Sequence, residues 1–86
     1  MDSAALLYGL GGPQNVASLE GAQNRLRFEI SDPARVDAGV IREAGAIGVV
    51  RQKHSVQVIC ETAVDDCEKA VRALLTEHQD HESTRP

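Results

Sequence analysis

Aromatic residues are almost missing from this 86-residue chain, which has one Phe, one Tyr and no Trp. Its core must therefore be built from Val, Ile, Leu and Ala, and burial of each larger aliphatic side chain contributes about 1.5–3 kcal/mol. A chain of this length forms one domain with a small core, so we expect modest stability. The composition, 42% hydrophobic and 26% charged, is typical of an ordinary soluble globular protein.

Positive charge is also scarce, because nine Lys and Arg residues face thirteen Asp and Glu, a formal net charge of −4. A general nucleic-acid binder or a polybasic membrane anchor needs a basic face, so this balance argues against both. No apolar run approaches the roughly 20 residues that span a bilayer. The opening MDSAALLYGLGG lacks the basic region and cleavage site of a signal peptide. We therefore expect a cytoplasmic protein without direct membrane insertion.

Cysteine is limited to Cys60 and Cys67, which are too few for a disulfide scaffold and do not form a zinc-type pair. Such usage fits a reducing compartment. Both positions fall on the apolar side of a predicted strand or helix, so we expect small core residues with raised pKa values and little reactivity. His78 and His81 lie with acidic residues in a polar tail that is not expected to hold a stable ligand geometry. We predict no metal site and no cofactor.

The first half of the chain predicts a helix and two strands. The helix begins at a capping Ser3, carries leucines on one face and ends at GGP, residues 11–13. A short strand follows over residues 15–19, and a polar loop over residues 20–24. The next strand, RLRFEI at residues 25–30, alternates cleanly between two faces. Its inward side chains are Leu26, Phe28 and Ile30, and its outward ones are Arg25, Arg27 and Glu29.

The second half predicts a helix, a hairpin and a last helix. Residues 32–45 form one helix, with Asp32 as its N-cap and Gly45 at its end. Two β-rich runs, AIGVVRQ and SVQVIC, flank a polar turn and predict a hairpin whose outward residues include Gln57. The last helix begins at Thr62. Its apolar stripe consists of Val64, Cys67, Val71 and Leu74.

Hairpin connections make neighbouring strands antiparallel, and helices with one apolar side each would cover one face of the sheet. The predicted fold class is therefore α+β in the order α-β-β-α-β-β-α, a split α/β sandwich. It has a four-stranded antiparallel sheet with helices on one face and an open second face. We divide the chain into a folded domain at residues 1–77 and a polar, disordered tail at residues 78–86.

The open face would carry two arginines, Arg25 and Arg27, on one strand. At about 3.3 Å per residue, their side chains leave the sheet roughly 7 Å apart. Guanidinium groups at that spacing can bind one phosphoryl group, or carboxylates of a partner, through forked hydrogen bonds. Gln57 would join them if its strand lies nearby, and N–H groups of the loop at residues 20–24 could form an anion-binding nest. The alternative is that these exposed arginines serve solubility only.

Several short motifs follow one another in a fixed order: GG, NV, Leu19, RLR, VD at residues 36–37, GAIGVV at residues 45–50 and VQVI at residues 56–59. In this order and spacing the chain resembles the IIB component of the glucose family of the bacterial phosphoenolpyruvate:sugar phosphotransferase system, over nearly all of its length except the tail. The resemblance implies the same four-stranded fold. It also implies a phosphocarrier that takes a phosphoryl group from a phosphohistidine on a IIA partner, holds it on a cysteine and passes it to a sugar in the membrane-embedded IIC permease.

The acceptor loop of that family typically reads LDACITRLR, whereas this chain reads LEGAQNRLR. RLR is retained, but Ala22 stands at the position of the phosphocysteine. The resemblance therefore places the catalytic position at Ala22. It implies contacts to phosphate or to a partner from Gln23, Asn24, Arg25, Arg27 and Gln57. A methyl group cannot accept a phosphoryl group, so we expect no transferase activity from the chain in this form.

Two explanations of Ala22 stay open. It is either an engineered replacement in a working phosphocarrier or a natural change that leaves a non-catalytic binding or regulatory module. The altered neighbours Glu20, Gly21 and Asn24 favour natural divergence, because an engineered knockout would leave them intact. Glu61 also stands where the family usually has glycine. A third possibility is an unrelated small α/β domain.

The resemblance also implies partners and a location. These are a IIA phosphocarrier protein and a IIC permease, with glucose or N-acetylglucosamine as the expected sugar. We expect a monomer, as suits a mobile carrier, in the cytoplasm and held at the inner face of the membrane where a IIC permease binds it.

Overall fold

The computed structural model describes the backbone of residues 1–83 and, within it, the side chains of residues 1–77. The predicted α-β-β-α-β-β-α order is confirmed. Its elements are α1 (Ser3–Gly9), β1 (Val16–Ala22), β2 (Arg25–Ile30), α2 (Ala38–Glu43), β3 (Gly48–Arg51), β4 (Ser55–Ile59) and α3 (Asp65–Ser83), with short 3₁₀ helices η1 (Pro13–Asn15) and η2 (Pro33–Arg35).

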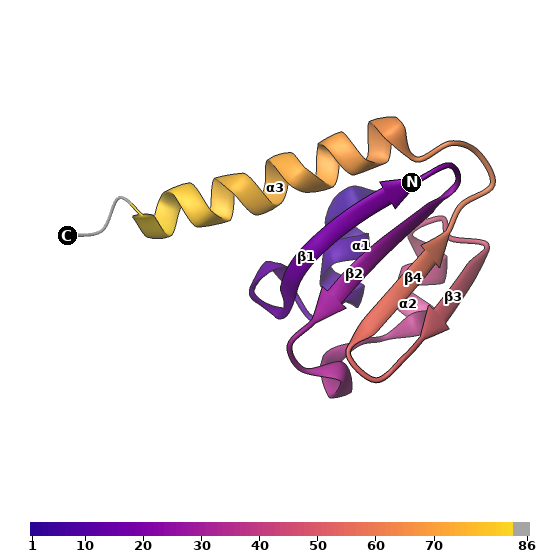
Figure 1. The fold of residues 1–86 in the computed structure, drawn as a ribbon, viewed down its shortest axis with the longest axis horizontal. Helices are drawn as coiled ribbons and strands as arrows, with labels where there is room; N and C mark the ends of the chain where they lie inside the picture. Colours follow the sequence, from indigo (N-terminus) through magenta and orange to yellow (C-terminus); the bar gives the residue numbers. More distant parts are fainter. Residues whose placement is uncertain (84–86) are drawn as a thin grey trace.

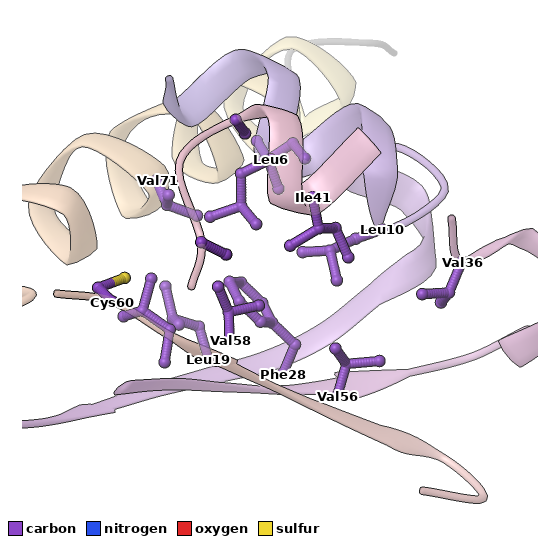
Figure 2. Close-up of a cluster of buried hydrophobic side chains, with 14 of the residues drawn as sticks. Leu6, Leu10, Leu19, Phe28, Val36, Ile41, Val56, Val58, Cys60 and Val71 are labelled. Atoms are coloured by element: carbon purple, nitrogen blue, oxygen red, sulfur yellow. The ribbon is translucent and has the colours of Figure 1, made fainter. Parts of the chain in front are cut away.

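The four strands form one antiparallel sheet in the order β1-β2-β4-β3. All three α-helices lie on one side of this sheet, and α3 runs beside the edge strand β1 and extends past it (Figure 1). The close-up in Figure 2 shows the sheet from its edge, with the helices above it and the buried side chains between the two layers. The predicted α+β class with one open sheet face is therefore confirmed.

The core is almost entirely aliphatic, as the shortage of aromatic residues requires. Phe28 is its one aromatic member and is fully buried beneath the helices (Figure 2). β2 alternates exposed and buried residues without interruption, as its sequence predicts. The other fully buried large side chains come from helices, strands and the loop before α3: Leu6, Leu10, Leu26, Ile41, Val58, Val64 and Val71.

The region predicted as one helix over residues 32–45 consists of two shorter pieces. Asp32 caps η2 by accepting a hydrogen bond from the Ala34 amide at 3.1 Å. Asp37 then adopts an extended conformation and caps α2 by accepting hydrogen bonds from two amides at its start. Each aspartate satisfies the amides that follow it, so the helix restarts at Asp37 instead of running through. Gly45 ends α2 at φ 125°, as predicted.

The starts of the other two helices also differ from prediction. The N-cap of α1 is Asp2, not Ser3, because the Asp2 carboxylate accepts the amide of Ala5 at 3.2 Å. α3 begins at Asp65 instead of Thr62, because the segment before it bends at residues 61–62 and is hydrogen-bonded to the β1–β2 turn through the amides of Cys60 and Val64. Its helical backbone continues through Ser83, which differs from the disordered tail expected from residue 78. Residues 84–86 of that tail lie outside the described residues, and the domain division stays a prediction.

Replacing Asp37 by alanine should lower the free energy of unfolding by about 0.5–2 kcal/mol, because it leaves the first amides of α2 without their acceptor. Urea denaturation followed by circular dichroism measures this loss. Glu43→Ala is the matched control, since it removes the same charge from an exposed position at the other end of α2. It should change stability by less than about 0.5 kcal/mol. Equal effects of both substitutions would show that the cap contributes nothing.

Candidate functional site

The β1–β2 hairpin places residue 22 directly beside the arginine pair. The register pairs Ala22 with Arg25 and Glu20 with Arg27, and all four residues are exposed on the open face. Directly opposite residues in an antiparallel pair have Cβ atoms about 4.5–5.5 Å apart, and diagonal neighbours lie about 7–8 Å apart. The Ala22 methyl group is therefore next to Arg25 and one diagonal step from Arg27.

Residues 20–24 are not the loop that the sequence predicts. β1 continues through Ala22, so only Gln23 and Asn24 turn the chain. Gln23 has a φ of 57°, a left-handed conformation that is uncommon outside glycine. Because residues 20–22 pair with β2 as a regular strand, they do not form the predicted nest of N–H groups. The side chains of the open face are the candidate ligands that the structure offers to an anion beside residues 20–22.

Asn24 holds the turn against the end of β4. Its carbonyl accepts the amide of Cys60 at 2.7 Å, and its side-chain nitrogen donates to the Cys60 carbonyl at 3.2 Å. The carbonyl of Gln23 likewise accepts the amide of Val64 at 2.9 Å. These three hydrogen bonds fix the turn to residues 60–64. The Asn24 amide is thus engaged in holding the site, and its contact with phosphate stays a prediction.

Gln57 lies where the sequence placed it, on the strand adjacent to the arginines. It is opposite Arg27 in the β2–β4 register, and its Oε1 accepts a hydrogen bond from Arg25 Nη1 at 3.2 Å. This bond holds the Arg25 guanidinium over the open face. Among the side chains that the structure describes, Arg27 takes part in no ion pair, so its donors remain available to an anion. Glu20 and Glu29 flank the pair, and Lys53 lines a pocket together with Arg27 and Glu29 at the far end of the strand.

The thiols of the chain do not reach this face. Cys60 points into the core from the end of β4 (Figure 2) and is 8% exposed. Burial is the main cause that raises the pKa of Cys60, and the neighbouring Cys67 thiol adds to it. Cys67 is half-buried at the start of α3, on the helical side of the sheet. Neither can stand in for a nucleophile at residue 22, and the expectation of a buried thiol with a raised pKa is confirmed for Cys60.

Two residues that sequence reasoning missed hold α3 against the hairpin. Arg72 donates to the carbonyl of Leu19 at 2.7 Å and to the Glu68 carboxylate at 2.9 Å. The Glu68 carboxylate lies over Gly21, where a Cβ atom would displace it. Glu68 and Arg72 are four residues apart on a helix, and this spacing is the sequence signal that could have found them. A residue larger than glycine at position 21 would therefore require the flexible Glu68 side chain to move.

These features define a small α+β domain whose open sheet face presents an arginine pair beside the tip of a hairpin. The chain is 42% identical over 60 residues to the PTS system N-acetylglucosamine-specific EIIB component of Streptomyces coelicolor. This alignment covers 70% of this chain and 78% of that protein. It is 39% identical over 71 residues to the PTS system N-acetylglucosamine-specific EIICB component of Bacillus subtilis, and 32% identical over 82 residues to the phosphotransferase enzyme IIB component GlvB of Escherichia coli K12. No family model matches the chain.

The chain belongs to the EIIB components of the phosphotransferase system, of the glucose type. The alignments cover 81% of this chain but 16% of the Bacillus protein, and 94% of this chain but 51% of GlvB. Within the described residues, none of the helices combines the length and the apolar character that crossing a membrane requires.

Proposed function

We propose that this domain is a IIB-type phosphocarrier of the sugar phosphotransferase system whose acceptor position, residue 22, is occupied by alanine. The observation that supports this most is the register, in which Ala22 is exposed opposite Arg25 and diagonal to Arg27. A thiol at residue 22 would lie beside two guanidinium groups, which favour its thiolate and stabilise a phosphoryl group in transfer. Alanine leaves this arrangement in place but supplies no nucleophile.

The reaction that the site would support with a cysteine has two steps. The thiolate attacks the phosphorus of the IIA phosphohistidine, an S–P bond forms, the N–P bond breaks, and the released imidazole takes up a proton. A hydroxyl oxygen of the sugar then attacks the phosphorus, the S–P bond breaks and the thiolate is regenerated, while the hydroxyl proton passes to a base. In both steps Arg25 and Arg27 would bind the non-bridging phosphoryl oxygens.

The partners that we propose are a IIA phosphocarrier protein as donor and a IIC permease as the site of sugar phosphorylation. Relatives whose names combine EIIC with EIIB support the IIC partner. The names of two relatives support N-acetylglucosamine as the sugar. The domain would act in the cytoplasm, at the inner face of the membrane when bound to the permease.

Replacing Ala22 by cysteine should convert the chain from no phosphorylation to one phosphoryl group per molecule. The test incubates Ala22→Cys with a phosphorylated IIA protein that is first shown to phosphorylate the Streptomyces coelicolor relative. Intact-protein mass spectrometry counts the phosphoryl groups. Alkylation of the new thiol before the reaction should abolish the gain, because the thiolate is the nucleophile.

The unaltered chain is the control for this experiment, because it retains Cys60 and Cys67 but has no thiol at residue 22. It should stay unlabelled, since its thiols lie on the helical side of the sheet. If Ala22→Cys remains unlabelled while the relative is labelled by the same donor, the phosphocarrier proposal is wrong. Labelling of the unaltered chain would place the acceptor elsewhere.

The second candidate function is a non-catalytic IIB-like binding module. It is favoured by the hydrogen bonds that hold the altered turn, because Asn24 is engaged with Cys60 and Arg25 with Gln57. Such a module would bind a IIA-like partner through the free Arg27 without transferring phosphate. Titration calorimetry of the unaltered chain with IIA proteins tests it. Absence of binding, or a cysteine codon at position 22 of the gene, would exclude this candidate.

A further inference from the structure

Three sulfur-containing residues lie on the helical side of the sheet, away from the arginine pair. Met1, Cys60 and Cys67 line one pocket between the N-terminus, the end of β4 and the start of α3. The Cys67 sulfur lies 3.7 Å from the Met1 sulfur. Cys60 and Cys67 are separated by seven residues of sequence but line the same pocket. Since Met1 is 44% exposed, the pocket is open to solvent on its side.

The position of Met1 is held by the backbone around it. The amide of Asp2 donates to the carbonyl of Ala44 at 2.9 Å. Gly45 has a φ of 125°, and a Cβ atom there would lie 3.3 Å from the Met1 Cα. The glycine at residue 45 therefore lets the N-terminal residues of the chain approach the end of α2. The Met1 thioether is placed against Cys67 by these contacts.

We propose that Met1, Cys60 and Cys67 form a binding site for a soft monovalent ion, Cu(I), with two thiolates and one thioether as ligands. Soft ions prefer thiolate and thioether sulfur, whereas hard ions prefer oxygen. Three sulfur ligands arranged trigonally around an ion, with metal–sulfur bonds of about 2.3 Å, lie about 4.0 Å from one another. The distance of 3.7 Å between the Met1 and Cys67 sulfur atoms is within about 0.3 Å of this separation. Binding replaces the proton of each thiol, and both protons are released to solvent.

The thioether is the ligand that makes this a three-donor site. Among the described residues, His, Cys, Asp and Glu side chains form no group of three that could hold a metal ion. The sequence predicts no metal site because its cysteines form no zinc-type pair and its tail histidines lack a stable geometry. Met1 is 59 residues from Cys60, and only the fold brings them together. The inference does not depend on the phosphocarrier proposal, since residue 22 lies on the opposite face of the sheet.

Anaerobic titration with Cu(I) in competition with the chelator bicinchoninate tests the site on the intact chain. One Cu(I) ion should bind per molecule, and Cys60→Ser and Cys67→Ser should each weaken binding about 100-fold or more. Asp66→Asn is the control, because Asp66 lines the pocket but lies outside the sulfur set. It should change the affinity less than about 3-fold, since carboxylates are poor ligands for soft ions. Equal losses of Cu(I) affinity in all three variants would show that the ion binds non-specifically and would overturn the proposal.

A second measurement avoids substitution of the cysteines. The chain has a single methionine, so selenomethionine labelling places selenium at residue 1 alone. X-ray absorption at the selenium edge should then show copper as a bonded neighbour. Replacement of Met1 by norleucine should weaken Cu(I) binding about 10-fold, because one of three ligands is lost. Bound copper without a copper–selenium contact, or oxidation of the thiols to a disulfide in place of copper binding, would overturn the proposal.

Discussion

Replacing Arg25 by glutamine in the Ala22→Cys chain should lower the rate of phosphoryl transfer from IIA about 100-fold or more. Arg25 is the directly opposite partner of residue 22, so its side chain leaves the sheet closer to the new thiol than that of Arg27 does. Loss of one donor that stabilises developing charge in an acyl- or phosphoryl-transfer site typically costs about 100- to 1000-fold in rate. Glutamine keeps a hydrogen-bonding side chain but removes the charge. Quenching the reaction at a series of times and measuring the phosphorylated fraction by mass spectrometry gives the rate.

Arg42→Gln in the same background is the matched control for this experiment. Arg42 is an exposed arginine in the last turn of α2, on the helical side of the sheet, so its loss changes the net charge equally. Its effect should stay within about 3-fold, because an exposed charge on the far side is screened by salt. Arg27→Gln should give an intermediate loss, since Arg27 is only a diagonal neighbour of residue 22. Equal rates for Arg25→Gln and Arg42→Gln would remove the arginine pair from the mechanism.

Replacing Phe28 by alanine should lower the free energy of unfolding by about 3–5 kcal/mol. Phe28 is fully buried and is the one aromatic member of the core, so no neighbouring ring can fill the space it leaves. A small domain has only about 5–15 kcal/mol of stability in total, and this chain is expected at the low end. The variant should therefore begin to unfold at a low concentration of urea. Denaturation monitored by circular dichroism measures the shift in midpoint.

Glu29→Ala provides the comparison for the core substitution. Glu29 is the next residue of β2 and is exposed on the open face, so it should change stability by less than about 0.5 kcal/mol. The contrast tests the alternation on which the assignment of the two faces depends. A loss below about 1 kcal/mol for Phe28→Ala would contradict the packing described here.

The altered residues near the hairpin tip have different physical explanations. Gly21 is covered by the Glu68 carboxylate, which Arg72 holds in place. Asn24 bridges the turn to the end of β4 through both its backbone and its side chain. Ala22 has no such explanation, because it is exposed and its methyl group supports no neighbour in the hairpin. A change confined to Ala22 therefore alters the chemistry of the tip and leaves its geometry intact.

The local pattern of the sequence was sufficient to predict the strands and to place the two arginines on the same face. The alternation of RLRFEI determines by itself which side chains of β2 are buried, because successive residues of a strand point to opposite faces. The same parity placed Arg25, Arg27 and Gln57 together once their strands were adjacent. Helix boundaries were predicted less well, since Asp32 and Asp37 each cap a separate piece where one helix was expected.

The sequence by itself determined the fold class and the aliphatic core, because these follow from composition and from the periodicity of buried residues. Only the tertiary structure decided that β1 extends to the hairpin tip, that residues 60–64 hold the turn, and that Met1, Cys60 and Cys67 line one pocket. The physical reason is that these features depend on hydrogen bonds and contacts between segments far apart in the chain. No local pattern of residues encodes such contacts, so they become visible only when the chain is folded.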